Sequence, residues 1–162
     1  MPSKYNEYHR FLLSRLGQPP LVAVCMNPSA ANKSYSDRTI NRIINASKKL
    51  GYNGWLVANV YPERATNASD LDDFNPDLSE ENVQLILEFL IDNGIDEVWG
   101  AWGNLGQHSL VKVRNHLLDS FKQNNNCVYS FAPLIKWGQP VHPLNRSVKQ
   151  NISEAGKLYL DF

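Results

Sequence analysis

The sequence contains few cysteines and no long apolar run, and each absence excludes a class of protein. Its two cysteines, Cys25 and Cys127, lie far apart in the chain. This spacing favours neither a disulfide framework nor a zinc site and is typical of buried free thiols. No apolar run approaches the ~20 residues that a membrane-spanning helix needs, and residues 1–15 lack the apolar centre of a signal peptide. We therefore expect a cytoplasmic protein that is not embedded in a membrane.

Net charge is also absent. Sixteen Lys and Arg residues balance sixteen Asp and Glu residues. A neutral chain weakens the case for tight binding to a nucleic-acid backbone, because such binding depends on many cations that neutralise phosphates. The neutral balance leaves room for a local basic patch, but it favours a small ligand.

Strand and helix patterns alternate along the chain. Four short apolar runs predict strands that are buried on both faces, at residues 21–26, 55–60, 97–102 and 127–132. Apolar spacing and capping residues predict helices at residues 5–16, 36–50, 79–94, 107–123 and 145–158. The alternation predicts an α/β fold in one domain, residues 1–162: a three-layer α/β/α arrangement with a mainly parallel four-stranded sheet.

Polar loops follow all four predicted strands, on the edge of a parallel sheet where ligands bind. In the first loop, Pro28 restricts the residue before it, so the Asn27 amide is held where it can position a water molecule. The alternative is that Asn27 only bonds the local backbone in an Asx-type turn. In the last loop, His142 precedes Pro143 and can donate a hydrogen bond to a leaving group. The alternative there is a half-buried structural histidine.

Four ordered motifs carry a resemblance that extends over almost the whole chain. They are MNPSAANKSYSDRTI at 26–40, LVANVYPERAT at 56–66, VWGAWG at 98–103 and GQPVHPL at 138–144. In this combination the chain resembles the uracil-DNA glycosylase-like superfamily, and more closely a prokaryotic and viral branch described only as a domain of unknown function. The resemblance implies a glycosylase-like version of the α/β fold.

The resemblance also implies a role for each motif. Asn27 would place the attacking water, and Asn59 would read the edge of a base by hydrogen bonds. Trp102 and Gly103 match the Trp-Gly pair that ends the third strand, and His142 would stabilise the departing base. The ligand is then a nucleobase, a nucleotide or a nucleotide-derived molecule, with DNA less favoured by the net charge.

Several other loop residues have two interpretations each. Asp37 is a candidate base, or a carboxylate that stabilises a sugar cation, but it could equally cap a helix. Arg64 could clamp a phosphate or pair with a loop carboxylate. Tyr61 and Trp102 could stack on a base or pack in the core. The remaining expected substrate-binding residues are Pro28, Ser29, Thr66 and Gly103. No pair of histidines or carboxylates has metal-ligand spacing, so we expect no metal and no cofactor.

The chain departs from the glycosylases in two places. Ser29 stands where the Asn type usually has glycine, and the loop after Pro143 lacks the small polar run that glycosylases insert into duplex DNA. We expect an N-glycosidase that hydrolyses the N-glycosidic bond of a nucleobase, in a free nucleotide more than in duplex DNA. Two alternatives stay open: non-catalytic binding of a nucleotide-derived molecule, as in a sensor or sponge, and an interaction module that keeps only the fold.

Overall fold

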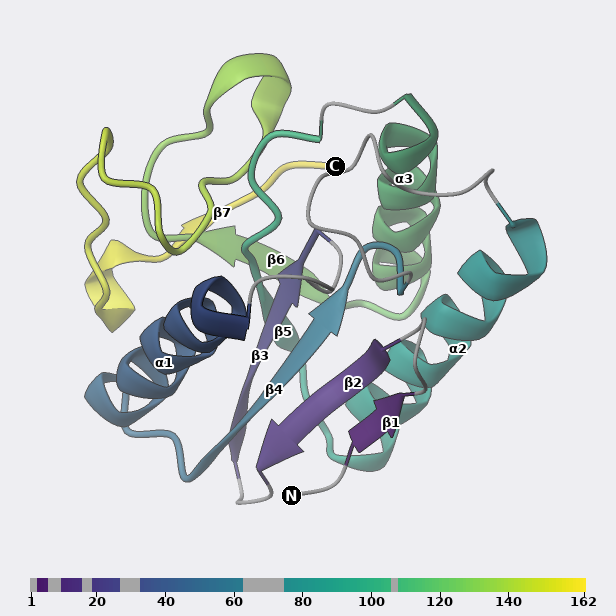
Figure 1. Cartoon of the computed structure of the whole chain (residues 1–162), viewed down its shortest axis with the longest axis horizontal. Coiled ribbons are helices and arrows are strands. Elements are labelled where there is room, and N and C mark those ends of the chain that lie inside the picture. The colour runs from purple at the N-terminus through teal and green to yellow at the C-terminus, as the bar shows by residue number, and fades with distance from the viewer. Residues whose placement is uncertain (1–2, 6–9, 16–18, 27–32, 63–74, 106–107) are drawn as a thin grey trace.

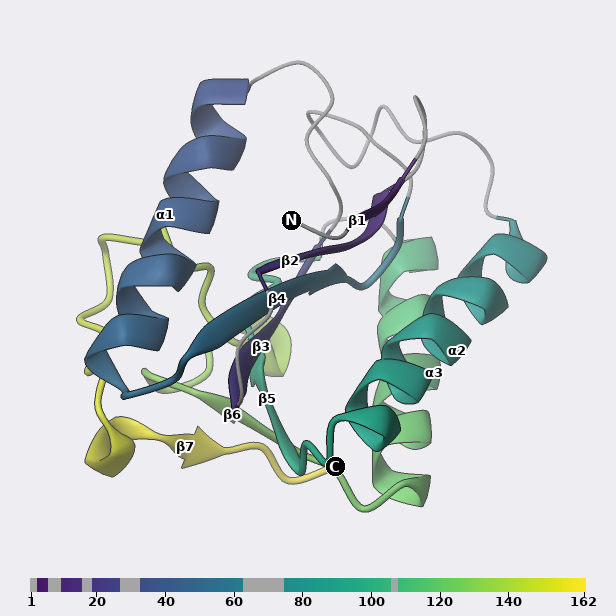
Figure 2. The same cartoon turned by 90° about the horizontal axis from the view of Figure 1, so that it is seen from below.

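The computed structural model describes residues 3–5, 10–15, 19–26, 33–62, 75–105 and 108–162. Within these ranges the chain forms a seven-stranded sheet in the order β1-β2-β4-β3-β5-β6-β7. Helices lie on both faces of this sheet, as Figure 1 and Figure 2 show.

The centre of the sheet is parallel. Its four strands, in spatial order, are β4 (Gly54–Asn59), β3 (Pro20–Cys25), β5 (Glu97–Gly100) and β6 (Cys127–Ser130). Each pairs in parallel with its neighbour, and β3 and β4 are buried along their whole length. The parallel strands predicted from the four apolar runs are therefore confirmed. The expected total of four strands is wrong, because three further strands extend the sheet at its edges.

The first segment of the chain is a pair of strands, so the helix expected at residues 5–16 is wrong. β1 (Ser3–Tyr5) pairs antiparallel with β2 (Arg10–Arg15), and β2 pairs antiparallel with β4, with Leu12 opposite Ala58. A short apolar run fits a helix or a strand by its spacing alone. The edge of β4 offers a row of backbone partners, and this tertiary context outweighs the helical pattern.

The helix expected at residues 145–158 is also wrong. The tail contains a single 3₁₀ turn, η3 (Glu154–Gly156), followed by β7 (Leu158–Tyr159), which pairs antiparallel with β6. A Cβ atom at Gly156 would lie 1.9 Å from the carbonyl oxygen of Asn151, so this turn needs glycine. As at the other edge, pairing with an open strand replaces the hydrogen bonds of a helix.

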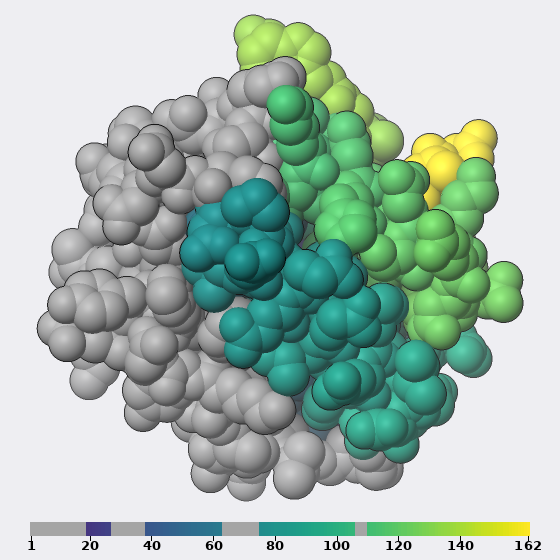
Figure 3. Space-filling view, turned by 90° about the vertical axis from the view of Figure 1, so that its right-hand side faces the viewer, coloured from purple at the N-terminus to yellow at the C-terminus, as the bar shows by residue number. Residues whose placement is uncertain are grey.

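The helices form two outer layers. α1 (Lys33–Lys49) covers one face of the sheet, while α2 (Pro76–Asp92) and α3 (His108–Gln123) lie side by side on the other, the face seen in Figure 3. Neighbouring residues of β3 point to opposite layers: Leu21 packs in the core under α1, and Val22 in the core under α2 and α3. These layers confirm the α/β class, whereas a glycosylase-like fold in particular stays a prediction.

Helix α2 shows how local sequence sets a boundary. The side chain of Asn75 accepts hydrogen bonds from the backbone N–H groups of Asp77 and Leu78, and Pro76 occupies the first helical position. Both features favour a helix start, so α2 begins before the expected Ser79. None of the described helices is both long and apolar enough to cross a membrane.

Candidate functional site

The strand order reverses beside β3. From β3 the chain passes to β4 on one side and then to β5 on the other side of β3. In parallel sheets, ligands bind beyond the carboxyl ends of the strands where the order reverses in this way. The ends meet closely: the Val60 N–H donates to the Cys25 carbonyl at 2.7 Å, and the Ala101 N–H donates to the Val24 carbonyl at 2.8 Å. The expected site therefore begins beside β3 and β5.

Part of the expected site lies outside the described residues. These positions are Asn27, Pro28, Ser29, Arg64 and Thr66. The backbone of Asp37 lies in α1, but its side chain is also outside the description. The convergence of Asn27 and Asp37 with the other site residues therefore stays a prediction.

Two of the expected residues, Gly103 and His142, are brought into contact. Gly103 follows β5 and has a φ of +67°, a left-handed conformation that favours glycine. A Cβ atom at Gly103 would lie 3.1 Å from the His142 Cβ atom. The loop after β5 therefore packs directly against the loop that carries His142.

The imidazole of His142 is held as one neutral tautomer. The backbone N–H of Leu144 donates a hydrogen bond to His142 Nδ1 at 3.1 Å. Burial lowers the pKa of His142 to about 4, so the ring is neutral at neutral pH. A neutral imidazole carries one proton, and because Nδ1 accepts, that proton sits on Nε2. His142 is therefore a neutral Nε2–H donor.

The loop around His142 is fixed by hydrogen bonds on both sides. The amide of Gln150 and the backbone N–H of Asn145 both donate to the His142 carbonyl oxygen, at 3.1 Å and 2.9 Å. Before the loop, the Trp102 Nε1–H donates to Gln139 Oε1 at 2.7 Å, and both residues are buried. Sequence reasoning missed Gln139 as a partner of Trp102. Together these bonds give the ring little freedom to reorient.

Trp102 contributes mainly to packing in the structure. Its side chain is only 1% exposed, and its indole N–H is satisfied by Gln139. A base could stack on this ring only after neighbouring side chains moved. The role of Trp102 in ligand binding therefore stays a prediction, while its role in docking the His142 loop rests on the hydrogen bond.

The end of β4 is tied to α2. The amide nitrogen of Asn82 donates to the carbonyl oxygens of Asn59 and Val60, at 2.7 Å and 3.2 Å. The hydroxyl oxygen of Tyr61 accepts a hydrogen bond from the backbone N–H of Asn75 at 3.1 Å, at the start of α2. Asn59 and Tyr61 are both buried. These contacts hold the backbone from which Asn59 would meet a base.

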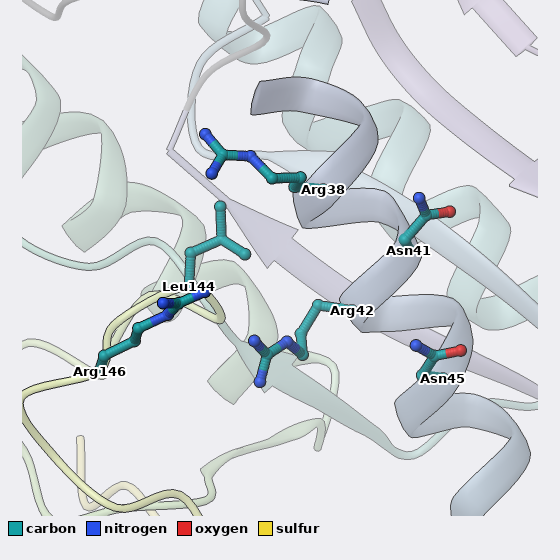
Figure 4. Close-up of a pocket in the computed structure, with 6 residues that line it drawn as sticks. All are labelled: Arg38, Asn41, Arg42, Asn45, Leu144 and Arg146. Atoms are coloured by element: carbon teal, nitrogen blue, oxygen red, sulfur yellow. The ribbon is translucent and has the colours of Figure 1, made fainter. Parts of the chain in front are cut away.

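A basic pocket lies beside the His142 loop. Its volume is about 390 Å³, and it is lined by Arg38, Asn41, Arg42, Asn45, Leu144 and Arg146. Figure 4 shows the arginines of α1 extending towards the segment that carries Leu144 and Arg146. We call this the arginine pocket. Leu144 joins it to the candidate site, because its side chain lines the pocket and its backbone N–H bonds the His142 ring.

Sequence reasoning missed two features whose signals were present. Asn82 occupies the buried face of α2, four residues after Leu78 and four before Ile86, and a polar residue in such a position indicates a buried hydrogen bond. Arg38 and Arg42 are also four residues apart on a helix and so share one face. Within the described ranges, no three His, Cys, Asp or Glu side chains gather closely enough to hold a metal ion.

A family model matches most of the chain. No curated protein and no solved structure matches it. The matching model is described as "Protein of unknown function (DUF1643)" and covers residues 10–144. That range includes every residue expected in the site, from Asn27 to His142, but the description names no activity, so a relation to the glycosylases stays a hypothesis. Because the match extends from β2 to the His142 loop, the chain belongs to the DUF1643 family.

Proposed function

We propose that this protein recognises a nucleobase, in a nucleotide or in DNA, and hydrolyses its N-glycosidic bond. The observation that carries the proposal is the fixed, neutral imidazole of His142, with Nδ1 occupied by the Leu144 N–H and the proton on Nε2. A base that leaves a sugar gains negative charge as the bond breaks. A preorganised donor stabilises that charge more strongly in the transition state than in the ground state.

The neutral state of His142 suits this role. An imidazole whose pKa is about 4 does not deliver a full proton to the base at neutral pH. It donates a hydrogen bond that strengthens as charge develops, without reorganisation of the surrounding protein. Protonation of the departing base can then follow from solvent.

The remaining steps use water and the other strand-end residues. The bond between the sugar C1′ and the base nitrogen breaks, and its electron pair leaves with the base. A water molecule adds to C1′ and loses a proton, so that the products are the free sugar hydroxyl and the protonated base. In this scheme Asn27 positions the water, Asp37 stabilises the sugar cation, and Asn59 bonds the edge of the base.

Base release measured by chromatography tests the proposal. The protein is incubated with uracil-containing DNA and with a panel of nucleotides, alongside the variants His142→Ala and Asn27→Ala. His116→Ala is the matched control, because His116 lies on α3 and pairs with Glu80 at the surface. We expect release by the wild type and the control, and its loss in the two site variants.

Two other results would each favour a different function. Thermal stabilisation by a nucleotide that is recovered intact would support binding without cleavage. The absence of both release and stabilisation across the panel would favour an interaction module.

A further inference from the structure

Three of the cations of α1 follow one line along the helix. Arg38, Arg42 and Lys49 are separated by four and seven residues, a spacing that places side chains on one helical face. Arg42 and Lys49 line a second pocket of about 350 Å³, in which Ile152 supplies the opposite side. The arginine pocket shares Arg42 and Asn45 with this second pocket. The two pockets therefore form one groove between α1 and the tail, which we call the α1 groove.

The described lining of the α1 groove is basic. Four of its lining residues are basic, namely Arg38, Arg42, Lys49 and Arg146, and none of the described residues that line either pocket is Asp or Glu. Arg42 and Arg146 form no ion pair within the part of the chain that the structure describes. Gathering like charges in one groove is unfavourable unless an anion neutralises them. The groove therefore fits an anionic ligand.

We propose that the α1 groove binds successive phosphate groups of a nucleotide chain. Guanidinium groups bind phosphate oxygens through paired hydrogen bonds, and three arginines surround the first pocket. From Arg38 to Lys49 the helix rises about 16 Å, at 1.5 Å per residue. A single phosphate occupies one end of such a groove, whereas consecutive phosphates of one strand, about 3.4 Å apart along a duplex axis, extend along it.

The position of Leu144 connects this groove to the catalytic proposal. A strand in the arginine pocket would contact the Leu144 side chain, and the backbone of the same residue holds the His142 ring. A nucleotide next to the bound phosphates could then reach His142. This connection rests on the proposed function, whereas phosphate binding by the groove does not.

Fluorescence anisotropy with a labelled single-stranded oligonucleotide tests the inference directly. Unlabelled mononucleotide and dinucleotide serve as competitors, and each titration is repeated over a salt series. The variants are Arg42→Gln and Arg146→Gln, and the matched control is Lys122→Gln, an exposed residue at the end of α3 on the other face of the sheet. Circular dichroism and thermal melting confirm that every variant folds.

The expected result is a clear order of affinities. The oligonucleotide should bind more tightly than the dinucleotide, and the dinucleotide more tightly than the mononucleotide. Each arginine variant should weaken oligonucleotide binding roughly tenfold at low salt and reduce the slope of log K against log salt by about 0.7. Lys122→Gln should bind like the wild type.

Two results would overturn the inference. One is a mononucleotide that competes as well as the oligonucleotide, which would leave no role for successive phosphates. The other is an arginine variant that binds like Lys122→Gln. The failure of each proposal gives a different result. Oligonucleotide binding that depends on Arg42, without base release, would contradict the proposed glycosidase activity. Base release without any effect of Arg42 on oligonucleotide binding would contradict phosphate binding by the groove.

Discussion

Helices α1 and α2 have the same length and opposite charge. Each contains 17 residues, and they lie on opposite faces of the sheet (Figure 2). The charged residues of α1 are Lys33, Asp37, Arg38, Arg42, Lys48 and Lys49, whereas those of α2 are Asp77, Glu80, Glu81, Glu88 and Asp92. A balanced total therefore conceals a basic helix and an acidic one.

This difference changes what the neutral charge implies. The sum of sixteen positive and sixteen negative residues favoured a small ligand over a polyanion. The local field at a surface depends on the charges near it and is screened within about 10 Å at moderate salt. A nucleotide chain that approaches α1 meets cations, while one that approaches α2 is repelled. The net charge therefore cannot decide between these ligands.

Substitutions of two histidines, His142 and His116, should give the largest difference in the rate of base release. His142 is a half-buried neutral donor beside the arginine pocket, whereas His116 is half-exposed and pairs with Glu80 across α3 and α2 at 2.8 Å. We expect His142→Ala to slow base release roughly 100- to 1000-fold, because one transition-state donor is lost. His116→Ala should leave the rate unchanged. Equal rates of base release for both variants in a chromatographic assay would contradict the role of His142 as the donor.

The dependence of stability on pH should separate the same two residues. Burial lowers the pKa of His142 from 6.5 to about 4. Below pH 6.5 the unfolded chain gains a proton that the folded protein gains only near pH 4, so His142 makes stability fall as pH drops through this window. The full loss is roughly 3 kcal/mol, at about 1.4 kcal/mol for each unit of pKa difference. Urea unfolding between pH 7 and pH 4 should show a weaker dependence for His142→Gln than for the wild type, and an unchanged dependence would contradict this assignment.

Charge reversal tests the contrast between the helices themselves. Arg42→Glu should weaken binding of a single-stranded oligonucleotide roughly 30-fold at low salt, because an attractive contact becomes a repulsive one. Glu81→Arg on α2 makes a charge change of the same size on the other face, and it should alter the affinity much less. Anisotropy titrations of both variants give the comparison. Equal and opposite effects would mean that only total charge matters.

The smallest expected effects concern the ion pairs of Lys157 and of His116. Lys157 is only 3% exposed and binds Glu97 and Glu154, while the side chains of His116 and Glu80 are 48% and 52% exposed. Burial alone would lower the pKa of Lys157, but hydrogen bonds from the lysine to these two carboxylates outweigh it and raise that pKa. Lys157→Met should lower the free energy of unfolding by about 2 kcal/mol, less than a fully buried pair because both carboxylates are partly exposed. Glu80→Gln should cost under ~1 kcal/mol. Urea unfolding at pH 7 measures both values, and similar losses would contradict the burial argument.

Sequence patterns predicted the centre of the sheet better than its edges. The apolar runs that became β3 to β6 specify strands because both of their faces are covered by helices. The edge strands depend on what lies beside them: β2 needs the open edge of β4, and β7 needs that of β6. Local spacing does not contain that information, and residues 5–16 and 145–158 were therefore expected to be helical.

Sequence patterns also predicted only part of the candidate site. Gly103 and His142 could be predicted to meet because both follow parallel strands, whose ends share one edge. Only one side of the arginine pocket could be predicted, from the spacing of Arg38 and Arg42 on α1. Arg146 is far from both in sequence and meets them only through the path of the tail. The arrangement of Asn27 beside them stays a prediction.

The neutral Nε2–H form of His142 is the central claim, and ¹⁵N NMR of the histidine side chains tests it most directly. The His142→Gln variant assigns the signal. The account predicts a ring that is neutral at pH 7, protonated at Nε2, and titrates near pH 4. A ring that titrates near pH 6.5, or that carries its proton on Nδ1, would contradict it.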